Sequence, residues 1–117
     1  MPRSANTIDF IEFPARNVRD IKTTKAFYAN VFAWSFKDWG DDYIDTSTSG
    51  VGVGFNADPA HRPARPLAVI YTPDLETTRA QVIAAGGTVT REVFAFPGGK
   101  RFHFTDPSGN ELAAWSE

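Results

Sequence analysis

The sequence Asp-Ile-Lys-Thr-Thr-Lys-Ala at residues 20–26 returns 54 residues later as Asp-Leu-Glu-Thr-Thr-Arg-Ala at residues 74–80. Four of the seven positions are identical, and Ile/Leu and Lys/Arg exchanges keep the type of side chain at two others. Two copies are too few for a solenoid, in which at least about three units must stack to bury a core. The repeat therefore indicates a duplicated module.

Each copy has the same order of local signals. Residues 10–13 and 67–71 are predicted strands, and each is followed by an aspartate, Asp20 or Asp74, whose carboxylate can accept the free N–H groups of a helix start. These aspartates predict helices at 21–32 and 75–85, the second ending at two glycines. Three strand-like segments follow in each copy: 34–39, 43–48 and 51–55, then 88–95, 100–105 and 111–115. We therefore predict an α+β fold of two tandem βαβββ modules.

The same pattern predicts the domain organisation. Residues 1–7 are expected to be a flexible N-terminal arm, and 8–116 a single domain. Within it, module one covers 8–55, and module two covers 67–116. The residues between them, 56–66, contain three prolines and two arginines, a composition that favours a linker.

Composition excludes several classes of protein. The 117 residues carry 12 basic and 14 acidic side chains, a net charge of −2, so the chain lacks the basic field of nucleic-acid binders. It has no cysteine, which excludes disulfides, thiolate zinc sites and a cysteine nucleophile. No apolar stretch approaches the roughly 20 residues that span a bilayer, and the first residues lack a signal peptide's apolar segment. We expect a cytoplasmic protein with neither nucleic acid nor membrane as a partner.

Strand alternation predicts one functional face. A sheet with helices on one side sends alternate side chains to the helices and the others to the open face. In the strand at 100–105, for example, Phe102 and Phe104 belong to the core, which leaves Arg101 and His103 on the open face. Applied to every strand, this rule collects seven side chains typical of a small-molecule pocket on one concave face: Phe10, Glu12, Tyr71, Arg101, His103, Glu111 and Trp115.

Three of these residues are candidates for catalysis. Glu12 and Glu111 could work as an acid–base pair if both point into the concave face. His103 could contact a ligand or, with both glutamates, hold an atypical metal, since three such ligands suffice for a catalytic site. The simpler interpretations are that Glu12 is solvated or pairs with Arg101, and that His103 has a structural role.

The remaining candidates would bind a ligand. Phe10, Tyr71 and Trp115 are predicted pocket walls that stack on a flat or apolar molecule, and Arg101 could attract its anionic group. The alternative for the aromatic residues is that they form a dimer seam or simple core.

These features together resemble a known family. The paired βαβββ modules, the helix segment Lys-Ala-Phe-Tyr at 25–28 leading to Val-Phe-Ala-Trp at 31–34, and the closing segment Phe-His-Phe-Thr-Asp-Pro-Ser-Gly-Asn-Glu at 102–111 are similar to the vicinal oxygen chelate superfamily. It includes glyoxalase I, bleomycin-resistance proteins, extradiol dioxygenases and fosfomycin-resistance enzymes. The resemblance implies that the two modules form one half-open, cup-shaped mixed sheet with the helices outside.

The resemblance also implies where a metal would be held. Enzymes of that family usually bind a divalent metal through His, Glu or Gln on the first and last strand of each module. The matching positions here are Phe10, Gly54, Leu67 and Ala113, none of which can ligate a metal. We therefore predict no metal and no other cofactor.

The function that follows is a glyoxalase- or bleomycin-resistance-like protein that binds a small, partly aromatic molecule in the cup without metal. The alternative is a lyase, isomerase or dioxygenase of the same superfamily that uses His103, Glu12 and Glu111. A third possibility is an interaction module without a small ligand. Whether the protein is an enzyme stays open at this point, because this fold hosts both enzymes and binders. The resemblance and an otherwise unpaired sheet edge also predict a homodimer.

Overall fold

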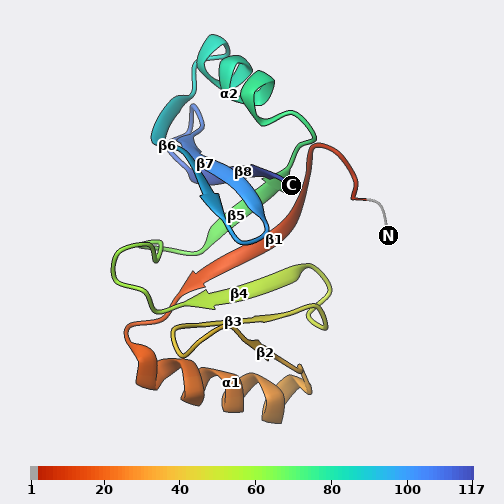
Figure 1. The fold of residues 1–117 in the computed structure, drawn as a ribbon, viewed down its shortest axis with the longest axis vertical. Coiled ribbons are helices and arrows are strands. Elements are labelled where there is room, and N and C mark those ends of the chain that lie inside the picture. Colours follow the sequence, from red (N-terminus) through yellow and green to blue (C-terminus); the bar gives the residue numbers. More distant parts are fainter. Residues whose placement is uncertain (1–2) are drawn as a thin grey trace. The chain divides into compact units, whose positions relative to one another are not determined.

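The computed structural model describes residues 3–117, and its elements follow the predicted order (Figure 1). The first group is β1 (Thr7–Pro14), α1 (Val18–Phe32), β2 (Lys37–Asp38), β3 (Tyr43–Thr46) and β4 (Gly52–Asn56). The second is β5 (Leu67–Tyr71), α2 (Leu75–Ala84), β6 (Thr88–Phe96), β7 (Gly99–Thr105) and β8 (Glu111–Ser116). This is the predicted α+β class with a βαβββ order that occurs twice.

Residues 3–117 divide into two compact units, one of residues 10–67 and one of residues 3–9 with 68–117. In the first unit β1 pairs with β4 in parallel, and β4, β3 and β2 pair antiparallel in that order. The second unit repeats the scheme, because β5 pairs with β8 in parallel, followed by antiparallel β7 and β6. Each parallel pair thus joins the first and last strand of a module. The predicted module and linker boundaries stay a prediction.

The first unit has a core between α1 and its strands. Ile21 on α1 is buried with Ile44, Val53 and Phe55 from β3 and β4. Ile11 and Phe13 pack against this cluster, as the alternation in β1 predicts. The helix does not begin at Asp20, however. Asn17 is its N-cap and accepts a hydrogen bond from the Asp20 backbone N–H at 2.9 Å, so α1 is three residues longer at its start than predicted.

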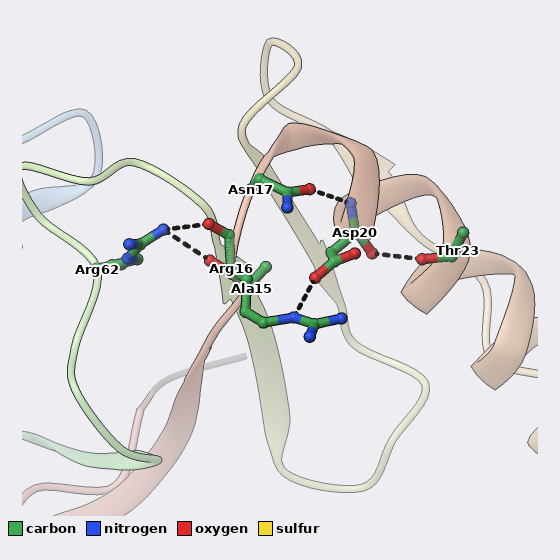
Figure 2. Close-up of polar contacts among 6 residues, drawn as sticks. All are labelled: Ala15, Arg16, Asn17, Asp20, Thr23 and Arg62. Atoms are coloured by element: carbon green, nitrogen blue, oxygen red, sulfur yellow. Dashed lines mark hydrogen bonds and ion pairs between the residues drawn. The ribbon is translucent and has the colours of Figure 1, made fainter.

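The turn before α1 is held by a residue of the predicted linker (Figure 2). The guanidinium of Arg62 donates from Nη1 to the backbone oxygens of Ala15, at 3.2 Å, and Arg16, at 2.5 Å. Arg16 in turn pairs with the Asp20 carboxylate at 2.7 Å. The segment between the modules is therefore fastened to the end of β1.

The strand predicted at 34–39 is mostly absent. Only Lys37–Asp38 pairs as β2. The ring of Trp34 instead stacks on Tyr28 of α1, with centroids 4.8 Å apart and planes 7° from parallel. Phe36 packs against the same core. The aromatic residues that suggest a strand are used here to cover the helix.

In the second unit, α2 lies beside β6 and β7, as Figure 1 shows. Its core contains Leu75, Phe102 and Ala114, with Phe104 packed against them, which confirms the predicted helix-facing side of β7. Asp74 caps α2 as predicted and accepts a hydrogen bond from the Thr77 backbone N–H at 3.1 Å. A hydrogen bond from the Thr77 hydroxyl, and after it this backbone bond, lower the pKa of Asp74.

The turn between β7 and β8 is built around Asp106. Its Oδ1 accepts hydrogen bonds from the backbone N–H groups of Ser108 and Asn110, both at 2.9 Å, and these bonds help to lower its pKa. Gly109 follows at φ +84°, a backbone conformation that L side chains rarely adopt. The turn fixes β8 antiparallel to β7, with His103 opposite Ala113.

Residues 1 and 2 of the predicted N-terminal arm lie outside the described residues. The guanidinium of Arg3 lies over the Trp115 ring, with Cζ 4.6 Å from the centroid, and the Asn6 backbone N–H donates to the Tyr71 carbonyl at 2.8 Å. No helix within residues 3–117 is both long and apolar enough to cross a membrane.

Candidate functional site

Glu12 is the buried carboxylate of the first unit. It lies in β1, on the side away from Ile11 and Phe13, and is only 2% exposed. The Tyr43 hydroxyl donates to its Oε1 at 3.0 Å. Glu12 is therefore not solvated, and Tyr43 on β3 is a partner that the sequence pattern did not reveal.

The space beside Glu12 is filled by two rings. Gly54 on β4 pairs with Glu12 across the parallel ladder. A Cβ at Gly54 would lie 2.7 Å from Cζ of Phe10 and 2.9 Å from Cζ of Tyr43, closer than real Cβ contacts. Phe10 and Tyr43 thus pack where a side chain at residue 54 would stand, and the glycine makes this packing possible.

The other two positions matched to metal ligands are hydrocarbon and buried. Leu67 on β5 is 2% exposed, and Ala113 on β8 is fully buried. With Phe10 and Gly54, these side chains offer neither nitrogen nor oxygen. They therefore do not fit a divalent metal bound by the first and last strand of each module. Nor do three His, Asp or Glu residues gather as a possible metal site anywhere in residues 3–117.

His103 on β7 is the buried ionisable group of the second unit. The residue is 6% exposed, and burial lowers the pKa of its imidazole to about 4, with further lowering by the charges of Arg101 and Arg91. The ring is therefore neutral at pH 7, with one N–H and one lone pair. Its Nε2 has no hydrogen-bond partner in residues 3–117, an arrangement that is rare for a buried polar atom.

Glu111 lies at the start of β8, beside His103. Its Oε2 is 3.9 Å from Nδ1 of His103, beyond a hydrogen bond, and accepts a hydrogen bond from the Thr90 hydroxyl at 2.8 Å. The Glu111 side chain is 44% exposed. The structure therefore places Glu111 near His103, at the solvent edge of this face.

Aromatic rings surround the other predicted ligand contacts. Cζ of Arg101 lies 5.3 Å from the Phe94 ring centroid and 5.9 Å from that of Phe96. Trp115 meets Tyr71 edge to face, with centroids 5.3 Å apart. The Trp115 indole Nε1 donates to Asp9 at 3.0 Å, which leaves its ring fixed and half-buried.

The second unit thus brings together five predicted site residues: Tyr71, Arg101, His103, Glu111 and Trp115. Glu12 and Phe10 lie in the first unit, among Tyr43 and Gly54. Two residues that sequence reasoning missed, Arg91 and Phe94, belong to the second group, since the Phe94 ring centroid is 5.8 Å from that of His103. The sequence offered one indirect signal, since the predicted strand at 88–95 has eight residues and the one that follows it, at 100–105, has six.

A separate hollow of about 390 Å³ lies beside α1 in the first unit. It is lined by Pro14, Thr23, Thr24, Phe27, Tyr28 and Phe55. These side chains include no carboxylate, imidazole or ammonium group, so the hollow offers little acid–base chemistry.

Comparison with known proteins gives one match at the level of families. The model of the Glyoxalase/Bleomycin resistance protein/Dioxygenase superfamily matches residues 7–114. No curated protein matches the sequence significantly.

Solved structures show the same fold at low sequence identity. A Legionella pneumophila protein described as an NAD-dependent benzaldehyde dehydrogenase is 12% identical with a TM-score of 0.73, covering 92% of this chain and 96% of that one. A glyoxalase/bleomycin resistance protein/dioxygenase superfamily member from Vibrio splendidus is 14% identical with a TM-score of 0.70, covering 92% and 97%. The Mn(II)-bound glyoxalase from Novosphingobium aromaticivorans is 23% identical with a TM-score of 0.69, covering 96% of this chain but 39% of its own.

Proposed function

Because the chain belongs to the Glyoxalase/Bleomycin resistance protein/Dioxygenase superfamily, we propose that it binds a small, partly aromatic molecule without the metal usual in that family. The ligand would lie on the face of the second unit that carries His103, Tyr71 and Trp115. We further propose that the protein is cytoplasmic and a homodimer. Its partner is a small molecule, with neither nucleic acid nor membrane involved.

The observation that carries this proposal is the buried Nε2 of His103. A buried polar atom left without a hydrogen bond destabilises a protein by about 1–3 kcal/mol. A ligand group that donates a hydrogen bond to Nε2, or accepts one from it, would recover part of this energy. The neighbouring ring of Phe94 offers apolar contact for the rest of the molecule, and Trp115 lies on the same face of the sheet, opposite Arg101.

The absence of metal is supported by the side chains at Phe10, Gly54, Leu67 and Ala113. Thermal unfolding with Mn²⁺, Zn²⁺, Ni²⁺ and Fe²⁺ tests it directly. A metal at 100 times its Kd adds about 2.7 kcal/mol, a rise in Tm of roughly 10 °C for this chain length. We expect no rise. A clear rise that His103→Ala abolishes would show a relocated metal site and contradict the proposal.

Ligand binding is tested by titrating a panel of planar aromatic molecules, followed by calorimetry. For any ligand found, His103→Gln and Trp115→Ala should weaken binding at least tenfold. Phe27→Ala is the matched control, because Phe27 is an aromatic residue on α1 with 54% exposure, outside this face. The proposal fails if none of the panel binds, or if the two site variants bind as well as the control.

A second candidate is catalysis by His103, Glu12 and Glu111, as in a lyase, isomerase or dioxygenase. The buried carboxylate of Glu12 favours it, since a carboxyl group 2% exposed beside a tyrosine hydroxyl can hold or move a proton at Oε1. Turnover of any ligand identified above, measured with His103→Ala and Glu12→Gln, distinguishes the two functions. Full rates in both variants would exclude this catalytic assignment.

A further inference from the structure

Strand β6 contains two extra residues relative to its partner β7. The register pairs Val89 with Phe104 but Arg91 with His103, so two steps on β6 match one step on β7. A second irregularity follows, because Phe94 pairs with Arg101. Each extra residue is a β-bulge, a feature that re-aims side chains and is frequent beside active sites.

The bulges change which side chains share a face. In a regular strand Arg91 would lie on the same side as Val89, and Phe94 on the other. Val89 packs in the helix-facing core. Arg91 and Phe94 instead both lie opposite residues of the His103 side of β7. Cζ of Arg91 is 3.9 Å from the Phe94 ring centroid, which confirms that the two side chains are neighbours.

Two arginines, Arg91 and Arg101, add positive charge around these residues. Arg91 is half-buried and forms no ion pair within residues 3–117. Its charge, after burial and Arg101, is among the causes that lower the pKa of His103. The Glu111 carboxylate lies beside His103 and accepts a hydrogen bond from the Thr90 hydroxyl. An anionic ligand group would therefore be stabilised on this side of the sheet.

The geometry of Arg91 fits one kind of anion. A guanidinium that lies over an aromatic ring keeps its in-plane N–H groups available, and these match the two oxygens of a carboxylate. Beside it, Nε2 of His103 can exchange one hydrogen bond. The ring of Phe94 supplies an apolar contact next to both groups.

We propose that Arg91 is the specificity-determining residue of this site and that it selects a planar molecule carrying a carboxylate. Phe94 is a positioning residue that holds the guanidinium plane. This inference rests on the proposed function, because it names the chemical class of the ligand for the same face. Neither residue is distinguished by the sequence pattern alone.

The test compares benzoate with benzamide, which have nearly the same shape but differ in charge. We expect benzoate to bind at least tenfold more tightly to the unmodified protein by calorimetry or NMR titration. Arg91→Gln should remove this difference. Arg19→Gln is the matched control, since Arg19 is an exposed arginine on α1 and its loss changes net charge equally. Phe94→Leu should reduce the preference for benzoate several-fold.

The outcomes separate this inference from the proposed function. If benzamide binds as tightly as benzoate, or Arg91→Gln keeps the preference, the inference is wrong and the proposed binding face stands. The same holds if neither compound binds while other aromatic molecules do. If no aromatic molecule of any charge binds, both the inference and the proposed function fail. Circular dichroism of each variant verifies that it is folded.

Discussion

Replacing Gly54 by alanine tests the packing that stands where the superfamily would place a metal ligand. The new Cβ would meet Cζ of Phe10 at 2.7 Å and the hydroxyl end of Tyr43. Overpacking of this kind destabilises a core by about 1–3 kcal/mol. Moving Tyr43 also breaks its hydrogen bond to the buried Glu12 carboxylate, which contributes about 1.5–3 kcal/mol.

One effect acts in the opposite direction. Alanine restricts the unfolded chain more than glycine does, which stabilises the protein by about 0.4–1 kcal/mol. The expected net loss for Gly54→Ala is therefore about 3 kcal/mol. With an unfolding entropy of about 2.1 cal/mol/K per residue, the 117 residues give a fall in Tm of roughly 12 °C. Calorimetry and urea unfolding measure the two quantities.

A double-mutant cycle with Tyr43→Phe shows whether this reasoning is right. The phenylalanine variant already lacks the hydroxyl that Gly54→Ala displaces, so the second substitution should destabilise it by about 2 kcal/mol less. Additive losses would refute the argument, because Tyr43 and residue 54 would then not compete for the same space. A fall in Tm below about 3 °C for Gly54→Ala would refute it as well.

Three further predictions concern stability. The pKa of His103 is about 4 in the folded protein against 6.5 ordinarily, so the unfolded chain binds a proton at higher pH than the folded protein does. The free energy of unfolding should therefore fall by about 3 kcal/mol between pH 6.5 and pH 4. His103→Gln should flatten this profile of unfolding free energy against pH. Arg62→Met removes the two hydrogen bonds to backbone oxygens before α1 and should lower the free energy of unfolding by about 1–2 kcal/mol, measured with urea. Arg65→Met is the control, because Arg65 is exposed in the same segment. Equal stability of the two variants would contradict the bridging role of Arg62. Asn17→Ala should destabilise by about 1 kcal/mol through loss of the N-cap, whereas a larger loss for Asp20→Ala would mean that the cap is misassigned.

Local signals in the sequence were sufficient for the fold. The repeat at 20–26 and 74–80 placed both helices, and alternation placed Phe102 and Phe104 in the core. The repeat predicts the wrong start for the first helix, because Asn17 and not Asp20 caps α1, whereas Asp74 caps α2 as predicted. Identical motifs do not ensure identical caps, since the chain before each helix takes its own path.

The site was harder to predict because its contacts are not local. Glu12 meets Tyr43 from 31 residues away, a pairing that depends on the register of three strands. Arg91 was missed because strict alternation places it on the side of Val89, and alternation fails wherever a strand bulges. Arg101 and His103 were placed correctly on one face, since β7 has regular alternation.

The two extra residues of β6 also bear on how such a site can change over generations. Loss of one codon between positions 91 and 94 would shorten the strand by a residue and restore regular pairing there. Arg91 and Phe94 would then lie two residues apart, opposite His103 and Arg101, and would still share the His103 side of the sheet. In a strand without a bulge, the loss of one residue turns every later side chain to the other face. The extra residue thus lets this face keep its arginine and its aromatic ring through a change in strand length.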